Sequence, residues 1–363
     1  MLRRGFLSAL FALAALSAAA AADKPAPPTL NQAVAFPGGV TAQRDLPYAA
    51  LDGFRPLTLD LYQMPSKPKD LPRPAILFVH GGGWASGDAR HLNGFDDFPA
   101  TLAALAAKGY VVASVNYRLS GEAHFPAAVQ DVKSAIRWLR GQAADYNIDT
   151  TRMMVWGAEA GGQIAALAGT SCGVAPLEPA ADAKTKARLA SDCVEGVVDW
   201  YGPADLASWD AGAAHAPEAG APSRLGAYLG CEPADCAAGT VRTASPLSYI
   251  ESMSPPFLIQ HGAADTLVPP DQSQKLYDAL RAQNVPAEIL IYPGVGQDFA
   301  KAGAPDAAAS TKAIADMEDF IAKTFPPQPR QTDATSSART PARSAKTAKS
   351  KPARPDPRNK ARK

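Results

Sequence analysis

Apolar and polar positions along the chain predict strands that alternate with helices. Residues 57–62 alternate between apolar and polar side chains, as in a strand with one buried face. Residues 75–79 are continuously apolar, which is typical of a strand buried on both faces. The same reasoning predicts further strands at residues 110–117, 153–156, 196–200, 256–260 and 287–292.

Helical spacing of apolar residues predicts helices between and after these strands. The clearest case is residues 126–144, in which Val129, Val132, Ile136 and Leu139 fall on one stripe. Residues 201–250 are rich in Pro, Gly and Ala and predict a small cap or a long insertion. The remaining predicted helices cover residues 97–108, 162–168, 271–283 and 307–323.

The order of these elements predicts an α/β protein with a doubly wound, mostly parallel sheet, because sequential strand–helix–strand units place successive strands in parallel. Functional residues of such sheets lie at the carboxyl ends of the strands. We therefore expect the informative residues to follow Val79, Trp156, Gln260 and Tyr292.

The first 22 residues have the pattern of a signal peptide. Arg3 and Arg4 precede a short apolar run at residues 6–16, and Ala20-Ala21-Ala22 provides small residues for cleavage. The apolar run is too short to span a bilayer, so we expect no transmembrane segment after cleavage. A retained anchor is the alternative, and the paired arginines weakly resemble a twin-arginine signal. We therefore expect a secreted or periplasmic protein. Residues 23–39 are expected to be a linker, and residues 40–325 are expected to form one domain.

The C-terminal residues 326–363 form a basic tail that is expected to be disordered. They contain eleven Lys or Arg and two Asp, whereas the whole chain has a net charge of +1. Residues 1–325 therefore carry a net charge of −8. Such a tail is a candidate to contact an anionic polymer of the cell envelope or a nucleic acid, although no specific nucleic-acid motif is present. The alternative is a solvated tail without a partner.

Four cysteines are expected to form two disulfides after export to an oxidising compartment. Three pairings are possible. We favour Cys172 with Cys193 and Cys231 with Cys236, because each pair closes the shorter loop. Neither the cysteine spacing nor any phosphate-binding or dinucleotide-binding motif indicates a metal or a cofactor, so we expect none.

A glycine-rich loop follows the strand predicted at residues 75–79. Its sequence is His80-Gly81-Gly82-Gly83-Trp84. Glycines let backbone N–H groups approach an anion without interference from a Cβ atom, so this loop is a candidate oxyanion hole. We expect its donors to be Gly82, Gly83 and Ala160. A plain strand-to-helix turn is the alternative.

Together with this loop, several motifs give the chain a resemblance to bacterial α/β-hydrolase carboxylesterases of the hormone-sensitive-lipase or feruloyl-esterase-like group. The resemblance covers about residues 40–325 and implies the α/β-hydrolase fold with a small cap. It also implies a small acyl ester as the ligand class. The motifs are Asn116-Tyr-Arg-Leu119, Phe125-Pro-Ala-Ala-Val-Gln-Asp131, Gly157-Ala-Glu-Ala-Gly161, His261-Gly-Ala-Ala-Asp265 and Tyr292-Pro-Gly-Val-Gly-Gln-Asp-Phe299.

The resemblance assigns the three catalytic positions to Glu159, Asp265 and Gln297. The family places its nucleophilic Ser in Gly-x-Ser-x-Gly, where this chain has Glu159, and its acid at the position of Asp265. The family's basic His is replaced by Gln297, which has no nitrogen that titrates near neutral pH. We therefore expect little or no ester hydrolysis, with the Glu159 carboxylate occupying the oxyanion hole.

Several alternatives remain open. An active esterase with other catalytic groups is one, and an envelope ligand-binding protein is another. The second Gly-x-Ser-x-Gly, at residues 169–173, follows a predicted helix and contains Cys172, so Ser171 is a weak candidate nucleophile. A carboxylate nucleophile at Glu159 is also conceivable, but the release of its intermediate needs the missing His. The side chains expected to line the pocket are Trp84, His124, Trp200 and Tyr201.

Overall fold

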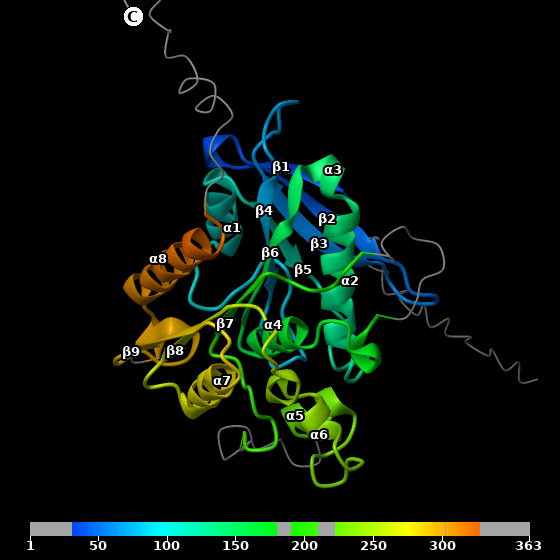
Figure 1. Cartoon of the computed structure of the whole chain (residues 1–363), viewed down its shortest axis with the longest axis vertical. Coiled ribbons are helices and arrows are strands. Elements are labelled where there is room, and N and C mark those ends of the chain that lie inside the picture. The colour runs from blue at the N-terminus through cyan, green and yellow to red at the C-terminus, as the bar shows by residue number, and fades with distance from the viewer. Residues whose placement is uncertain (1–30, 180–189, 210–221, 302, 327–363) are drawn as a thin grey trace, which may run out of the picture.

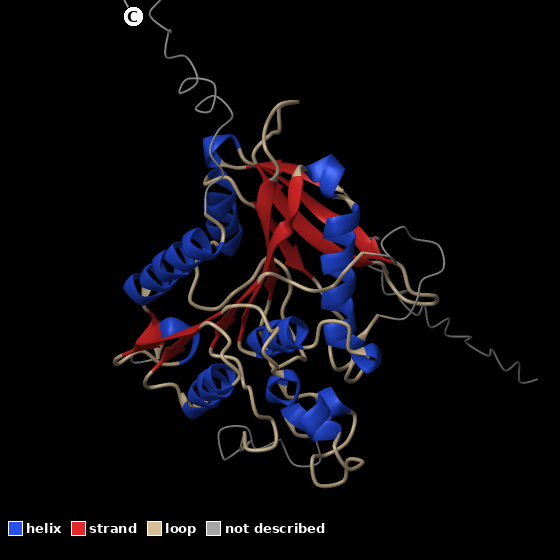
Figure 2. Cartoon of the chain, in the orientation of Figure 1, coloured by secondary structure: helices blue, strands red, loops and turns tan. Residues whose placement is uncertain are grey.

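The computed structural model describes residues 31–179, 190–209, 222–301 and 303–326. These residues form a large sheet with helices on both faces (Figure 1, Figure 2). Among the helices in these ranges, none is both long and apolar enough to cross a membrane. The expected signal peptide and residues 327–363 of the expected tail lie outside the described residues.

Nine strands form the main sheet of the described residues, in the order β1-β2-β3-β5-β4-β6-β7-β8-β9. The pairs at the β1 end, as far as β3 with β5, are antiparallel, whereas all pairs from β5 to β9 are parallel. The strands are β1 Gln32–Ala35, β2 Thr41–Ala49, β3 Leu57–Gln63, β4 Arg73–Val79, β5 Val111–Val115, β6 Ile148–Ala158, β7 Gly196–Trp200, β8 Phe257–Gly262 and β9 Ala287–Tyr292.

Helices lie between and after the parallel strands. Those predicted from the apolar pattern begin and end within a few residues of their predicted bounds. They are α1 Phe98–Ala107, α2 Ala127–Gly141, α3 Ala143–Tyr146, α4 Ala160–Thr170, α5 Arg224–Leu229, α6 Thr240–Thr243, α7 Asp271–Ala282 and α8 Ala307–Thr324. Short 3-10 turns are η1 Pro37–Gly39, η2 Ala175–Leu177, η5 Pro246–Tyr249 and η6 Gln297–Phe299, and a small hairpin after η6 is formed by β10 Ala300–Lys301 and β11 Ala304–Pro305.

Both faces of the sheet are covered, which explains the continuously apolar strands. Ile76 and Phe78 of β4 belong to a buried cluster that includes residues of α1 and α8. Leu77 and Val79 of the same strand belong to a second cluster, on the face covered by α2, α4 and α7. Successive side chains of a strand point to opposite faces, so a strand between two helical layers has no exposed face. The predicted α/β class and doubly wound sheet are confirmed.

The sheet begins earlier in the chain than predicted. Residues 23–39 were expected to be a linker, but Gln32–Ala35 pairs with β2 and η1 connects the two strands. Residues 23–30 lie outside the described residues. The side chains of β1 are mostly exposed, and the strand is held by backbone hydrogen bonds at the sheet edge. The pattern of apolar residues carries no signal for a strand of this kind.

The segment between β7 and β8 forms the predicted insertion. Its described part holds α5, α6 and η5, which lie together at one end of the molecule, at the bottom of Figure 1. Tyr228 of α5 stacks on Trp84 with ring centroids 4.6 Å apart, and the backbone N–H of Phe125 donates to the Tyr228 carbonyl (2.7 Å). These contacts fix the insertion above the end of β4.

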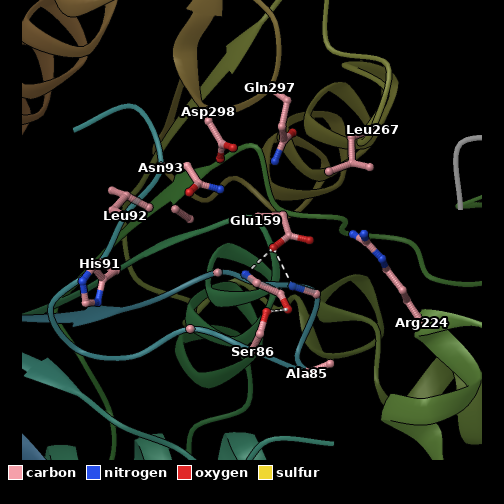
Figure 3. A pocket seen from close by; sticks show the side chains of 15 residues that line it. Ala85, Ser86, His91, Leu92, Asn93, Glu159, Arg224, Leu267, Gln297 and Asp298 are labelled. Carbon is pink, nitrogen blue, oxygen red and sulfur yellow. Dashed lines mark hydrogen bonds between the residues drawn. The ribbon is translucent and has the colours of Figure 1, made fainter. Parts of the chain in front are cut away.

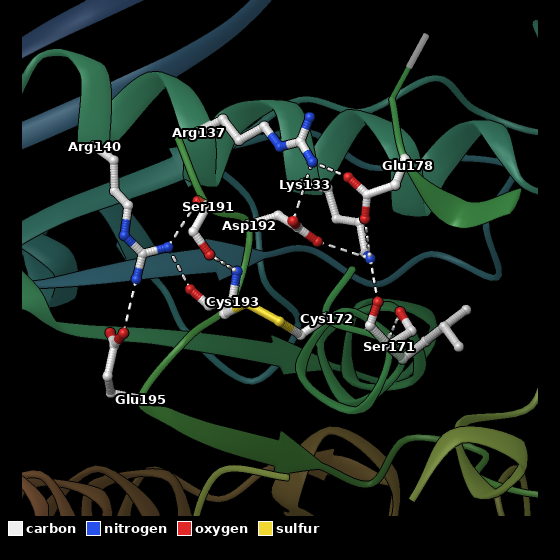
Figure 4. Close-up of a disulfide and its surroundings, with 11 residues drawn as sticks. Lys133, Arg137, Arg140, Ser171, Cys172, Glu178, Ser191, Asp192, Cys193 and Glu195 are labelled. Carbon is white, nitrogen blue, oxygen red and sulfur yellow. Dashed lines mark hydrogen bonds and ion pairs between the residues drawn. A yellow bond between two sulfur atoms is a disulfide. The ribbon is translucent and has the colours of Figure 1, made fainter. Parts of the chain in front are cut away.

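Two disulfides connect the pairs that loop length favoured, so the predicted pairing is confirmed. Cys231 and Cys236 close a short loop after α5, and Cys172 and Cys193 join the end of α4 to the segment before β7 (Figure 4). Beside the second disulfide, the buried Lys133 forms an ion pair with Asp192 at 2.8 Å.

Candidate active site

The loop after β4 has a backbone that requires glycine. Gly82 has a φ of 101°, and a Cβ atom there would lie 2.2 Å from the carbonyl oxygen of Ser86. Gly83 has a φ of 60°. The hydroxyl of Tyr117 donates to the carbonyl of His80 at 3.0 Å and holds the start of the loop. The N–H groups of Gly82 and Gly83 consequently face the end of β6.

The turn between β6 and α4 is tight and strained at its centre. Glu159 has φ 53° and ψ −118°, a conformation that side chains with a Cβ atom rarely adopt. A Cβ atom at Gly157 would lie 2.0 Å from the carbonyl oxygen of Gly161, and one at Gly161 would lie 2.1 Å from that of Val79. Only glycine therefore fits two residues before and two residues after Glu159, and the turn presents this side chain to the loop after β4.

The Glu159 carboxylate accepts hydrogen bonds from that loop. Its Oε2 atom lies 2.7 Å from the backbone nitrogen of Gly82 and 2.8 Å from that of Gly83 (Figure 3). The side chain is only 7% exposed. The expected internal carboxylate ligand is therefore seen at two of the three expected donors. The third, Ala160, is the first residue of α4, directly after Glu159.

Asp265 and Gln297 lie against each other at the ends of β8 and β9. With its amide nitrogen toward Asp265, the Gln297 side chain donates to Oδ2 at 2.5 Å and to Oδ1 at 3.1 Å. Asp265 Oδ1 also accepts from the backbone N–H groups of Leu267 (2.8 Å) and Val268 (3.0 Å). The structure thus brings together the predicted acid and the amide at the predicted base position, and the amide takes the hydrogen bonds that a His would make.

A pocket of about 590 Å³ opens over these groups. Its wall combines the glycine loop with polar side chains from four other parts of the chain (Figure 3). These side chains are Ser86, Asn93, Glu159, Arg224, Gln297 and Asp298, and Leu92 and Leu267 supply apolar surface.

Asp298 and Arg224 are pocket residues that the sequence did not single out. Burial, together with the nearby Glu159 and Asp265 carboxylates, raises the pKa of Asp298 to about 6. Asp298 was visible only as part of the last motif, next to Gln297. Arg224 belongs to the insertion, where no motif gives its distance from the pocket. Only the folded chain brings both residues to Glu159.

The four side chains that were expected to line the pocket do not line it. Trp84 is 1% exposed, and its indole N–H donates to Gln163 at 2.9 Å. Trp200 and Tyr201 are fully buried in the core under α1 and α8. His124 is exposed and lies beside Gly230 of the insertion. Large aromatic side chains next to the site pack into the core, and smaller polar residues form the wall.

Alternative nucleophiles and bases are placed unfavourably. Ser171 is completely buried at the far end of α4, and its hydroxyl donates to the carbonyl of Leu167 at 2.6 Å. Both ring nitrogens of His261 are engaged, with Ser273 (2.7 Å) and with the carbonyl of Val268 (2.8 Å). Burial lowers the pKa of His80 to about 4, so this ring is neutral at physiological pH. Within the described ranges, no cluster of three His, Cys, Asp or Glu side chains could hold a metal ion.

A family model described as BD-FAE matches residues 59–280 of the chain. The esterases LipC and LipQ of Mycobacterium tuberculosis are each 31% identical to it, over 251 and 237 residues. These matches cover 66% and 65% of this chain and 56% and 52% of the two relatives. The chain therefore spans about half the length of the curated relatives it matches.

Solved structures give the same picture. A truncated carbohydrate esterase from gut microbiota is 28% identical, with a TM-score of 0.64, over 80% of this chain and 98% of that one. Esterase 2 of Thermogutta terrifontis is 26% identical, with a TM-score of 0.61, over 81% and 95% of the two chains. The same esterase has also been solved with propionate and with butyrate bound.

Proposed function

Because the chain belongs to the BD-FAE family of α/β-hydrolase esterases, we propose that it is a member whose ester hydrolysis is absent or severely impaired and whose pocket binds a ligand without turning it over. The observation that carries this proposal is the Glu159 carboxylate on the N–H groups of Gly82 and Gly83. In an esterase these donors are free to stabilise the negative charge that develops on the substrate carbonyl oxygen. Here a charged side chain of the protein itself uses them.

Glu159 is also a poor replacement for the attacking Ser. A carboxylate that attacks an ester forms a mixed anhydride, and the Glu side chain is longer than Ser by two heavy atoms. A His that activates water would be needed to free the enzyme, and Gln297 stands at that position, bound to Asp265. Its amide reproduces the contact with the acid but cannot accept and return a proton.

The expected loss of rate is large. Loss of one triad member costs about four to six orders of magnitude, and a second loss adds little because the members act as a unit. Polarisation by the oxyanion hole alone gives up to about 10³-fold over water in triad mutants. Glu159 obstructs that remaining contribution as well.

Two solved structures of one relative are consistent with a pocket that accepts a carboxylate. Propionate and butyrate, which the T. terrifontis esterase binds, are both short carboxylates. Glu159 supplies a carboxylate from within the chain and would compete with any such ligand for the loop. The curated relatives are named esterases, and the chain spans only about half of each. We therefore take ester hydrolysis to be the ancestral activity of the family and not the activity of this chain.

Restoring both missing groups tests the proposal. We expect the Glu159→Ser/Gln297→His double variant to hydrolyse p-nitrophenyl acetate at least about a hundredfold faster than the wild type. Each single variant should remain close to the wild type, because nucleophile and base act together. Release of p-nitrophenolate by the purified full chain is the measurement.

Glu159→Ala is the matched control, because it opens the loop without supplying a nucleophile. Wild-type turnover that survives Glu159→Ala would contradict the proposal and favour an active esterase with other catalytic groups. A folded but silent double variant would show that Glu159 and Gln297 are not the nucleophile and base positions.

We also propose that the protein works outside the reducing cytosol, in the periplasm or secreted. The two disulfides support this location, because structural disulfides persist in oxidising compartments. When the chain is expressed with its own N-terminus in a Gram-negative bacterium, osmotic shock should release it. Its four cysteines should then be oxidised and should not react with thiol reagents. Retention in the cytosol with free thiols would contradict this location. Binding of an envelope polymer by residues 326–363 stays a prediction.

A further inference from the structure

Two oppositely charged groups face each other across the pocket. Arg224 extends from the start of α5 toward Glu159 (Figure 3). Within the described ranges, the Arg224 guanidinium has no hydrogen bond or ion pair. Glu159 is 93% buried, and of its two oxygens only Oε2 takes the N–H groups of the glycine loop. One cation and one carboxylate oxygen are therefore available to the same ligand.

The position of Arg224 is fixed by its surroundings. Its aliphatic stem lies beside the loop, with Cδ 3.3 Å from the point where a Cβ atom of Gly83 would be. Ser223, the residue before it, caps α5 by accepting from Gly226 at 2.9 Å and donates to Glu232 at 2.7 Å. The Cys231–Cys236 disulfide follows the same helix. These contacts position the start of α5, from which the Arg224 side chain extends along Gly83 to the pocket wall.

The opposite end of the pocket is acidic. Asp298 lines the wall, and burial together with the nearby carboxylates of Glu159 and Asp265 raises its pKa to about 6. Asp265 is occupied by Gln297, so Glu159 and Asp298 are the carboxylates that meet a ligand. The electric field across the pocket therefore runs between an acidic end and a single guanidinium.

We propose that the pocket binds a small zwitterion, an amino acid with an apolar side chain, with its ammonium group at Glu159 and its carboxylate at Arg224. This inference rests on the proposed function, since it takes the ligand to be bound and not hydrolysed. A guanidinium matches a carboxylate through two parallel hydrogen bonds, and an ammonium offers three donors to carboxylate oxygens. Leu92 and Leu267 of the pocket wall supply the apolar contact.

A ligand with one charge fits less well. A simple carboxylate gains the contact with Arg224 but is repelled by Glu159 and Asp298. A simple amine gains the acidic end and leaves the guanidinium without a partner. Only a zwitterion is attracted at both ends.

Calorimetric titration of the wild-type full chain with three matched probes tests this inference. L-leucine carries both charges, 4-methylpentanoate lacks the amino group, and 3-methylbutylamine lacks the carboxylate. We expect L-leucine to bind at least ~10-fold more tightly than either analogue, equivalent to one charge-assisted contact. Equal affinity of L-leucine and one analogue would overturn the zwitterion, and so would the absence of binding by L-leucine.

Two substitutions assign the ends of the ligand. Arg224→Gln should weaken L-leucine and 4-methylpentanoate at least ~10-fold and leave 3-methylbutylamine unchanged. Glu159→Gln keeps an oxygen for the loop and should weaken L-leucine and the amine only. Arg242→Gln removes an exposed arginine of α6 that is not in the pocket wall and is the matched control. An equal loss in Arg242→Gln and Arg224→Gln would overturn the assignment.

The outcome is separable from that of the proposed function. Hydrolysis of p-nitrophenyl acetate by the wild type would overturn the inactive esterase and leave the comparison of the three probes intact. If the wild type does not bind L-leucine but the Glu159→Ser/Gln297→His variant hydrolyses p-nitrophenyl acetate, only the proposal of a zwitterionic ligand is overturned.

Discussion

Single residues decide what the site can do, and the backbone around them decides which residues fit. Gly157 and Gly161 leave room for a tight turn only because they lack Cβ atoms. Glu159 between them sits at positive φ and reaches the N–H groups of the loop after β4. The strain of this turn is a property of the esterase fold. A changed side chain at its centre therefore inherits a preorganised position next to two hydrogen-bond donors.

Gly82 allows the steric and the conformational requirement to be separated. Gly82 (φ 101°) and Gly109 (φ 102°) have nearly the same φ angle, but a Cβ atom would meet the carbonyl oxygen of Ser86 at Gly82 and open space at Gly109. We expect Gly109→Ala to lower the free energy of unfolding by about 1 kcal/mol and Gly82→Ala to lower it clearly more. Urea unfolding of both variants is the measurement. Equal losses would mean that the loop moves aside without cost, and that its donors are less rigid than the structure indicates.

At this scale the sequence predicted the central residues and missed their neighbours. Glu159, Asp265 and Gln297 stand in motifs with fixed spacing to a strand end, so each could be placed from the sequence. Asp298 and Arg224 reach the pocket through η6 and the insertion, whose paths depend on tertiary contacts. The aromatic residues were misplaced because closeness in sequence to a strand end does not say which face of the sheet a side chain joins.

Elements with a strong apolar pattern were predicted to within a few residues, and elements held by other forces were not. The helix predicted at residues 126–144 ends at Gly141 and continues as the short α3. β1 is an exposed edge strand that backbone hydrogen bonds hold in place, so its side chains do not reveal it.

The connection of α2, α4 and the segment before β7 is a second case that the apolar pattern does not reveal. Lys133 lies on the buried side of α2 and donates to the carbonyl of Ser171, next to the Cys172–Cys193 disulfide (Figure 4). Burial lowers the pKa of this lysine, and its contact with Asp192 opposes that shift. A second ion pair, with Glu178 at 3.2 Å, also replaces hydration that the buried ammonium group has lost. The far end of the helix that begins after Glu159 is therefore fixed both covalently and by charge.

On the scale of the whole molecule, the alternation of strands and helices was sufficient to predict the two helical layers and the parallel sheet. The reason is physical, because each parallel pair needs a crossover and both faces of the sheet must be covered. The predictions for the two ends of the chain rest on composition and on the signal-peptide pattern, and apart from residues 31–39, where the linker prediction is corrected, and residue 326, they concern residues outside the described ranges.

Because the carboxyl group of Asp199 in β7 is buried in the core, the free energy of unfolding is expected to depend on pH. This side chain is 1% exposed, its Oδ1 accepts from the backbone N–H of Gly202 at 3.0 Å, and its Oδ2 has no partner among the described residues. Burial raises its pKa from the ordinary 3.8 to about 6, against the opposing effect of nearby His261. The folded state consequently binds the Asp199 proton more tightly than the unfolded state does.

A raised pKa in the folded state gives a contribution to stability that is complete below pH 4 and is lost as the pH rises to about 6. We expect Asp199→Asn, which keeps the oxygen for Gly202 and never ionises, to raise the free energy of unfolding at pH 8 by up to about 3 kcal/mol. At pH 4 the variant should match the wild type. Urea unfolding at both pH values, with the exposed Asp52→Asn as control, is the measurement. A gain of the same size at both pH values would assign the effect to packing, since ionisation of Asp199 contributes almost nothing at pH 4.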